Sequence, residues 1–331
     1  MKRDLFIRTD GSAQIGLGHV VRSMSLASYL RDVYHITFVF RQIPQKLQDE
    51  IESGGFALRK IESEEAFLSQ LSHGHIVVLD GYRFDTEYQK RVKEKGPLLI
   101  CTDDLHDQYF HADLVINHAP GITAENYRAE PTTQFALGPD YTLLRPPFIR
   151  AAASQQKSKK KPVKNLLICF GGSDSPNLTQ RSLKVARDFD PFEKIFIITG
   201  SAYLHENQLI REISGDERVE YHRSLNGSEM AELFLRSDVA IIPASGILFE
   251  ALATGSVAVS GMYADNQKEV YSGFKALDAI VDAGRFEEAE IRNALNQDWY
   301  SIEQPEIIDG KSPERLRSAF FRLQEEYVNQ N

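Results

Sequence analysis

A histidine inside a glycine-rich loop is the clearest candidate for chemistry in this sequence. The segment Arg8–Arg22 reads RTDGSAQIGLGHVVR and follows a short apolar run at residues 5–7. Gly16 and Gly18 let the backbone turn sharply and approach a ligand, and the helix that the next residues predict offers unpaired N–H groups to an anion. His19 lies where that helix begins.

Histidine at this position is suited to general-base catalysis. The unperturbed histidine side chain titrates near pH 6.5, and the positive end of a helix dipole disfavours the protonated ring. A histidine near a helix start is more often a cap or a surface residue, but the glycine loop favours a functional role, and we predict that His19 is the catalytic base. Asp10 is our candidate for orienting the ring. The predicted substrate contacts in this segment are Asp10, Gly16, Gly18 and Arg22.

Polar residues also follow the other apolar runs of the first half. These runs alternate with helical patterns, which predicts right-handed βαβ units and a parallel sheet. The predicted strands are residues 5–7, 36–40, 56–58, 76–80, 98–101 and 114–116. Ligands bind beyond the carboxyl ends of such strands. The candidate site therefore comprises Asp10–His19, Asp80–Arg83, Thr102–Asp104 and Asn117–His118.

The second half repeats the pattern, with predicted strands at 166–170, 195–200, 219–221, 239–242 and 257–259. Three features there predict a site for a nucleotide diphosphate. Gly171-Gly172-Ser173 and Ala244-Ser245-Gly246 each follow a strand and precede a helix, an arrangement that offers N–H groups to phosphate. Glu250 lies one turn after Gly246, where a carboxylate can accept hydrogen bonds from a ribose diol. Taken singly, each feature is more often a cap, a turn or a complement to the helix dipole.

The length of 331 residues predicts two domains. We place them at residues 1–150 and 164–331, joined by the polar and basic segment Arg150–Lys164. An amphipathic helix at Pro313–Tyr327 is expected to close one domain or to bridge both. The predicted fold class is α/β, with two Rossmann-like domains and parallel sheets that face one another across a cleft.

Composition excludes several classes of protein. The net charge of −9 argues against a nucleic-acid partner. No apolar stretch approaches the roughly 20 residues of a membrane span, and no signal peptide is visible, so we expect a cytoplasmic protein without a membrane partner. We also expect a monomer. Cys101 and Cys169 form no CxxC pair and are expected to be buried and reduced. The nine histidines form no HExxH motif, and Asp103-Asp104 is more typical of a capped turn, so we predict no metal and no cofactor.

The opening motif RTDGSxxIGxGHVxR closely resembles the PseG family, whose members are UDP-2,4-diacetamido-2,4,6-trideoxy-β-L-altropyranose hydrolases of pseudaminic acid biosynthesis. The opening motif is the specific part of the resemblance. Two residues, Gly81 and Gly246, depart from the usual residues of the family. Supporting matches extend over nearly the whole chain: Val78–Tyr82, Thr102–Asp104, Val115–Asn117, Phe170–Asp174, Ala244–Gly246 with Glu250, and Asn266–Gln267.

The resemblance implies a GT-B fold similar to that of MurG-type glycosyltransferases, with UDP bound mainly by the C-terminal domain and the sugar facing the N-terminal domain. It implies a metal-independent hydrolysis in which His19 activates water. Attack by that water opposite to UDP would invert the anomeric centre. Tyr82 and Asn266 match a tyrosine and an asparagine of the family. We expect Tyr82 to hold the water or a sugar substituent, and Asn266, beside Gln267, to bind an acetamido group or phosphate.

Two other functions stay open at this point. A glycosyltransferase of the same fold would pass the sugar to an acceptor, although the sequence contains no basic-aromatic or strongly apolar surface segment that would hold a lipid acceptor. A non-catalytic UDP-sugar-binding protein is the third possibility. The presence of both His19 and Tyr82 argues against it.

Overall fold

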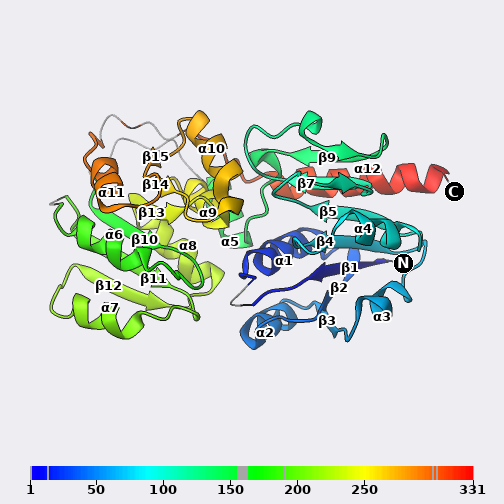
Figure 1. The fold of residues 1–331 in the computed structure, drawn as a ribbon, viewed down its shortest axis with the longest axis horizontal. Coiled ribbons are helices and arrows are strands. Elements are labelled where there is room, and N and C mark those ends of the chain that lie inside the picture. The colour runs from blue at the N-terminus through cyan, green and yellow to red at the C-terminus, as the bar shows by residue number, and fades with distance from the viewer. Residues whose placement is uncertain are drawn as a thin grey trace. The chain divides into compact units, whose positions relative to one another are not determined.

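The computed structural model describes residues 2–12, 15–154, 163–189, 191–299, 302 and 305–330. The chain divides into two compact units, shown in Figure 1. The first comprises Met1–Arg145 together with Lys311–Asn331, and the second comprises Pro146–Gly310. The first unit therefore ends at Arg145 and includes the C-terminal segment, whose helix the sequence pattern left to either domain or to a bridge between them.

The described part of the first unit contains a seven-stranded sheet in the order β3-β2-β1-β4-β5-β7-β9, in which every pair of neighbours is parallel. Its strands are β1 (Arg3–Thr9), β2 (Tyr34–Phe40), β3 (Ala57–Lys60), β4 (Ile76–Asp80), β5 (Leu98–Thr102), β7 (Leu114–Asn117) and β9 (Gln134–Leu137). The helices are α1 (Gly18–Leu30), α2 (Gln45–Ser53), α3 (Glu64–Leu68), α4 (Thr86–Lys93) and α12 (Ser312–Gln330), with short 3-10 turns at Ala124–Asn126 and Pro139–Tyr141. A small separate sheet pairs β6 (Tyr109–Phe110) with β8 (Arg128–Ala129).

The faces of this sheet explain where its polar residues point. Register places Phe6, Val77 and Leu99 side by side on one face, within a buried apolar cluster. Successive residues of a strand alternate between faces. Asp80, at the end of β4, therefore lies on the opposite face, where α1 packs against β4.

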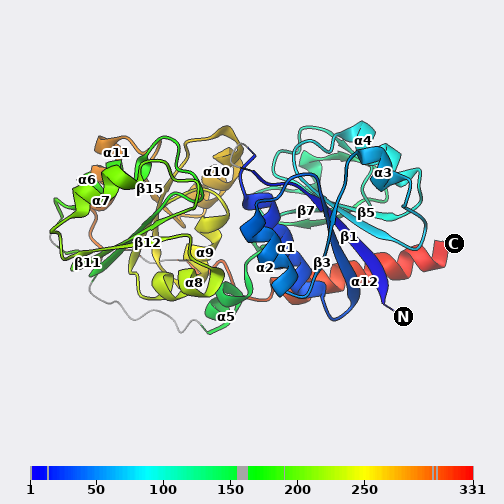
Figure 2. The same cartoon turned by 90° about the horizontal axis from the view of Figure 1, so that it is seen from below.

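Helix α12 returns the chain to the first unit. It packs against α1 and β9, and Figures 1 and 2 show it in red beside this sheet. Its apolar stripe of Leu316, Phe320 and Leu323 is buried, and the Phe320 ring lies 6.2 Å from that of Tyr34. The amphipathic pattern predicted this helix, but only the packing assigns it to the first unit.

The described part of the second unit contains a six-stranded parallel sheet in the order β12-β11-β10-β13-β14-β15. Its strands are β10 (Asn165–Cys169), β11 (Lys194–Thr199), β12 (Val219–Arg223), β13 (Val239–Pro243), β14 (Val257–Gly261) and β15 (Val281–Asp282). Its helices are α5 (Pro146–Ser154), α6 (Leu178–Ala186), α7 (Glu206–Ile213), α8 (Gly227–Leu235), α9 (Gly246–Thr254), α10 (Lys268–Ala276) and α11 (Glu288–Leu295), with a 3-10 turn at Asp265–Gln267.

The segment expected to be a linker begins inside a helix. Helix α5 packs against α8 and α9, and the Phe148 ring lies 5.8 Å from the Phe234 ring. Residues 150–154 are therefore part of the second unit. The remainder of the predicted linker falls mostly on residues 155–162, which lie outside the described residues.

Two α/β units with parallel sheets confirm the predicted α/β class with two Rossmann-like domains. In each sheet the strand order reverses at one point: between β1 and β4 in the first unit, and between β10 and β13 in the second. Such switch points leave a crevice beyond the carboxyl ends of the strands, where ligands bind in open α/β sheets. No helix in the described ranges has both the length and the apolar character needed to cross a membrane.

The Gly171-Gly172 turn is packed against another glycine, and this contact gives a test of the fold. A Cβ added at Gly200 would lie 2.3 Å from the carbonyl oxygen of Gly172. We expect Gly200→Ala to destabilise the protein by about 1–3 kcal/mol, because the two backbones must separate. Gly74→Ala is the control, since a Cβ there meets no atom within 4 Å. Thermal unfolding of both variants checks this, and equal midpoints would contradict the proposed packing.

Candidate active site

His19 is paired with a buried carboxylate. It lies in the first turn of α1, which follows β1, and Asp80 is the last residue of β4, so the two residues meet at the switch point of the first sheet. His19 Nδ1 lies 2.8 Å from Asp80 Oδ1, and both side chains are buried. An ionised carboxylate only accepts hydrogen bonds, so Nδ1 carries a proton, and in the neutral ring the lone pair lies on Nε2.

Arg22 keeps Asp80 ionised. Its Nε donates to Asp80 Oδ2 at 2.9 Å and its Nη2 donates to Oδ1 at 2.7 Å, while Ser23 Oγ donates to Oδ2 at 3.0 Å. Burial by itself would raise the pKa of Asp80, but the charge of Arg22 and the contact with His19 outweigh burial and lower it. His19, Arg22 and Ser23 can share one carboxylate because residues three and four apart lie on one helix face.

The Arg22 side chain therefore bonds to other side chains of the first unit. Its Nη1 donates to Asp104 Oδ1 at 2.6 Å, so the guanidinium bridges two carboxylates. Nη2 also lies 3.1 Å from His19 Nδ1, but two donors cannot bond to each other, and the carboxylate oxygens are their acceptors. These contacts engage both ends of the guanidinium, and its predicted contact with substrate remains untested.

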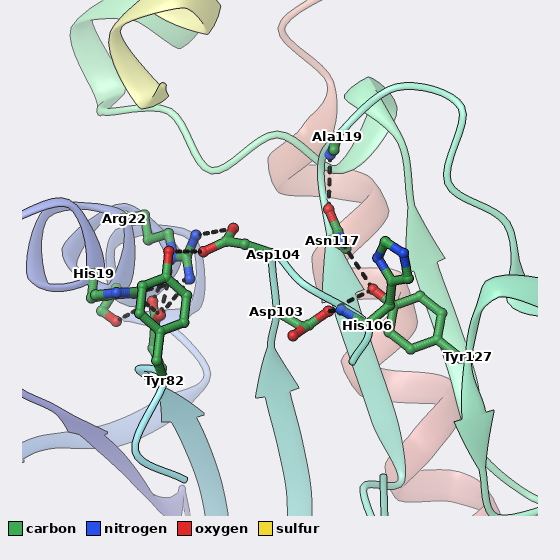
Figure 3. Close-up of polar contacts among 11 residues, drawn as sticks. His19, Arg22, Tyr82, Asp103, Asp104, His106, Asn117, Ala119 and Tyr127 are labelled. Carbon is green, nitrogen blue, oxygen red and sulfur yellow. Dashed lines mark hydrogen bonds and ion pairs between the residues drawn. The ribbon is translucent and has the colours of Figure 1, made fainter. Parts of the chain in front are cut away.

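Tyr82 completes this group of side chains. Its ring contacts His19 edge to face, with centroids 4.6 Å apart, and its hydroxyl donates to Asp104 Oδ2 at 3.0 Å, as Figure 3 shows. Tyr82 is 47% exposed, whereas His19 is buried beneath it. The pKa of Asp104 is lowered, because the Arg22 charge outweighs the opposing effect of burial. The candidate segments contained Asp80 and Asp104, but sequence reasoning gave Asp80 no role and interpreted Asp104 only as part of a capped turn.

Asp10 does not orient His19. Residues i and i+2 of an extended segment share a face, and Asp10 lies beside Arg8, with Nη2 and Oδ2 2.8 Å apart. Asp10 Oδ1 accepts the backbone N–H groups of Arg41 and Gln42, at 2.7 and 3.0 Å. Arg8 is fully buried and bonds to both carboxylate oxygens of Glu64. This ion cluster fixes the start of the glycine loop and leaves Asp80 to orient the histidine.

The two loop glycines have different reasons to be glycine. Gly16 has φ +88°, a conformation that favours glycine, and exchanges two backbone hydrogen bonds with Ser12. A Cβ at Gly18 would meet no atom within 4 Å, so this glycine leaves open space in front of α1. The two residues between Ser12 and Ile15 lie outside the described residues.

A second network supports the loop that carries Asp104. Asp103 Oδ2 accepts the Tyr127 hydroxyl at 2.9 Å and the His106 backbone N–H at 2.8 Å. Asn117 bonds to the Tyr127 hydroxyl and to the Ala119 N–H, both at 2.9 Å (Figure 3). Burial raises the pKa of Asp103. These bonds tie the segments that follow β5 and β7 together beside the His19 group.

In the second unit, a side chain of the protein caps the helix that follows the first predicted phosphate loop. Asp174 follows Gly171-Gly172-Ser173, and its carboxylate accepts the backbone N–H groups of Leu178 and Thr179, each at 2.8 Å. These two N–H groups stand at the start of α6 and would otherwise face a ligand. The glycine turn still lies beyond β10, but the start of α6 is satisfied from within the protein.

The start of α9 differs from that of α6. Ser245 is its N-cap residue and makes no side-chain capping bond, and the first turn contains no acidic residue. A Cβ at Gly246 would meet no atom within 4 Å. Glu250 is only 6% exposed, one turn further along the helix. Ala244, Ser245, Gly246 and Glu250 thus form a helix start that is open to an anion, with a carboxylate nearby.

Asn266 and Gln267 separate into two roles after β14, the strand next to β13. Gln267 is buried, and its Oε1 accepts the backbone N–H of Tyr263 at 2.9 Å, so it shapes the loop. Asn266 is exposed. The loops after β10, β13 and β14 therefore lie at one edge of the second sheet. Within each unit, the predicted site residues lie at such an edge.

Metal ligands are not grouped in the described part of the chain: no three His, Cys, Asp or Glu side chains there are arranged to hold an ion. Cys101 and Cys169 are both buried free cysteines, as predicted.

Three curated proteins are similar to this chain in sequence, although no family model matches it. An uncharacterized protein, MJ1062 of Methanocaldococcus jannaschii, is 30% identical over 81% of this chain, and the match spans only 57% of that longer protein. The spore coat polysaccharide biosynthesis protein SpsG of Bacillus subtilis is 26% identical over 84% of this chain and 83% of its own length. The UDP-2,4-diacetamido-2,4,6-trideoxy-beta-L-altropyranose hydrolase of Campylobacter jejuni is 25% identical over 80% of this chain and 93% of its own length.

Solved structures agree on the fold. MurG of Acinetobacter baumannii aligns with a TM-score of 0.63 at 12% identity, over 97% of this chain and all of that one. MnaA of S. aureus, solved with UDP, gives 0.60 at 11% identity over 99% and 97%, and the calicheamicin glycosyltransferase CalG4 gives 0.59 at 15% over 99% and 98%. At these identities the likeness shows the GT-B type of fold over 97–99% of this chain and leaves activity to other arguments.

A buried histidine beside the His19 group predicts a pH dependence of stability. Burial, and then the charge of Arg22, lowers the pKa of His118 to about 4. Between pH 6.5 and 4 His118 binds a proton in the unfolded chain but not in the folded protein, so its contribution to stability falls as the pH falls, by roughly 3 kcal/mol across the window. We expect His118→Gln to flatten this fall in urea unfolding measured from pH 7 to pH 4.

The exposed His35 provides the matched control, and His35→Gln should leave the pH dependence as in the wild type. Equal slopes for His118→Gln and the wild type would contradict the assignment.

Proposed function

We propose that this protein is a nucleotide-sugar hydrolase that releases UDP and a free 2,4-diacetamido-2,4,6-trideoxy sugar with inversion, in a pathway of the pseudaminic acid type. The single observation that carries this proposal is the His19–Asp80 pair at the switch point of the first sheet, 2.8 Å apart and buried. Similarity to the Campylobacter jejuni hydrolase over 93% of its length supports the choice of reaction. Similarity to SpsG supports a role in glycan biosynthesis.

The proposed reaction needs one proton acceptor and one charged leaving group. Water attacks the anomeric carbon, His19 Nε2 takes a proton from that water, and the bond from the anomeric carbon to the UDP oxygen breaks as the new bond forms. Asp80 stabilises the imidazolium that results, and the proton then passes to solvent. UDP leaves as an anion and needs no proton from an acid, so one base is sufficient.

The UDP in this proposal binds to the second unit at the start of α9. The N–H groups of that helix start and the Ser245 hydroxyl hold phosphate, since an open helix N-terminus attracts anions. Glu250 holds the ribose diol from one turn further along. Asn266, exposed beyond β14, contributes to the diphosphate or to an acetamido group. The Gly171-Gly172 turn contributes backbone contacts only, because Asp174 occupies the start of α6.

His19→Asn tests the catalytic base. We expect kcat for release of UDP from the diacetamido sugar nucleotide, without an acceptor, to fall by about 100- to 10,000-fold, because proton transfer by a positioned base contributes that much. KM should change little, since substrate binding does not need the proton acceptor. Products are followed by NMR, which also reports the anomeric configuration.

The control for folding is the affinity for UDP, which His19→Asn should leave unchanged. Full activity in this variant would exclude His19 as the base. Turnover by the wild type only after an acceptor is added would replace hydrolysis by glycosyl transfer, and tight binding without any turnover would favour a binding protein.

Glu250→Gln tests the nucleotide site independently of catalysis. A carboxylate that accepts two hydroxyl groups should make the wild type prefer UDP over 2′,3′-dideoxy-UDP by about 10- to 100-fold. We expect the preference to nearly vanish in Glu250→Gln, as measured by calorimetry. The exposed Glu232 of α8 supplies the control, and Glu232→Gln should keep the preference. If Glu250→Gln prefers UDP over the dideoxy analogue as strongly as the wild type does, Glu250 does not bind the ribose.

A further inference from the structure

Tyr82 has its only proton committed to Asp104. The hydroxyl donates to Asp104 Oδ2 at 3.0 Å, while the other oxygen of this carboxylate accepts Arg22 Nη1 at 2.6 Å. A carboxylate held between these two donors cannot itself donate. The phenol oxygen of Tyr82 therefore presents only its lone pairs to anything that approaches from the exposed side of the ring.

His19 also presents a hydrogen-bond acceptor. Its Nδ1–H faces Asp80, so Nε2 is left as an acceptor. The two rings touch edge to face with centroids 4.6 Å apart, which places both acceptors on neighbouring side chains. Both acceptors depend on one guanidinium, because Arg22 bonds to Asp80 and to Asp104 at once.

We propose that Asp104, held by Arg22, is a positioning residue that makes Tyr82 a hydrogen-bond acceptor, so that Tyr82 and His19 together hold both hydrogens of the attacking water. This inference rests on the proposed hydrolysis and adds to it the orientation of the nucleophile. One hydrogen of the water bonds to Tyr82 Oη and stays on the water oxygen, and the other bonds to His19 Nε2 and is transferred there. An oxygen lone pair is then directed away from both side chains, toward the anomeric carbon.

Asp104→Asn is the decisive substitution because Arg22 dictates how the amide must lie. Arg22 Nη1 needs an acceptor, so the amide oxygen faces Arg22 and the NH2 group faces Tyr82. Tyr82 then accepts from residue 104, and its own proton turns toward the water. The polarity of the phenol is reversed, while the size of the side chain at position 104 is almost unchanged.

The test is a double-mutant cycle on UDP release from the diacetamido sugar nucleotide. We expect Tyr82→Phe and Asp104→Asn each to lower kcat by about 10- to 100-fold with KM nearly unchanged, the value of one hydrogen bond to the nucleophile. The double variant should be no slower than Asp104→Asn, because both substitutions remove the same acceptor. Asp104→Glu, which keeps a carboxylate, should recover part of the rate.

Three outcomes would overturn the inference: full activity in Asp104→Asn, losses that multiply in the double variant, or a loss of rate that follows a fall in thermal midpoint and is not recovered by Asp104→Glu. Asp104→Ala is the second variant if the asparagine form does not fold. It removes the acceptor of the Tyr82 proton without adding a donor, so its loss should be smaller than that of Tyr82→Phe. An equal or larger loss would contradict the inference.

A spectroscopic measurement separates this inference from the proposed hydrolysis. In protein labelled with ¹³C at tyrosine Cζ, the Tyr82 signal is assigned by its absence from Tyr82→Phe. Donation to a carboxylate should move this signal downfield of free tyrosine, whether or not the protein hydrolyses a sugar nucleotide. An unshifted or upfield signal would overturn the role of Asp104, whereas a downfield signal without turnover would reject only the hydrolysis.

Discussion

The buried carboxylate of Asp80 is the constraint on which the candidate site depends. A buried charge must be paired, and Asp80 meets this requirement with Arg22, His19 and Ser23, all from one face of α1. Leaving one member of a buried ion pair without its partner typically costs about 3–5 kcal/mol. The same bonds that satisfy Asp80 also set the tautomer of His19 and pull Arg22 toward Asp104. Stability and the proposed role of His19 therefore rest on the same contacts, and a rotation of α1 would break these contacts.

In both sheets the candidate polar residues lie near the point where the strand order reverses, but their contacts differ between the two units. Each sheet has one point where the strand order reverses, and the candidate residues gather beyond the strand ends on either side of it. In the first unit these ends hold charged side chains that are paired with one another. In the second unit the start of α9 has no side-chain cap, whereas α6 is closed by Asp174. The proposed function therefore places the chemistry in the first unit and the anion site in the second, according to how each helix start is satisfied.

The first unit is assembled from both ends of the chain. Helix α12 packs on α1 and β9, and this packing buries the apolar stripe of α12 itself. The helix that supplies His19 and Arg22 is therefore supported on one side by Asp80 and on another by the C-terminal segment. Because the second unit lies between these pieces in sequence, the first cannot be complete until the last residues of the chain have joined it.

The sequence by itself determined the alternation of strands and helices, because apolar runs bounded by glycine and polar residues suit parallel strands buried on both faces. It also determined that His19 begins a helix after a glycine loop, and that Ser245 and Gly246 begin another. Only the tertiary structure decided which carboxylate serves the histidine. Asp10 and Asp80 both stand at strand ends, but Asp10 shares the face of Arg8, and Asp80 lies on the opposite face under α1. The face that a side chain occupies and the strands that become neighbours are set by pairing over long separations in sequence, which local patterns do not encode.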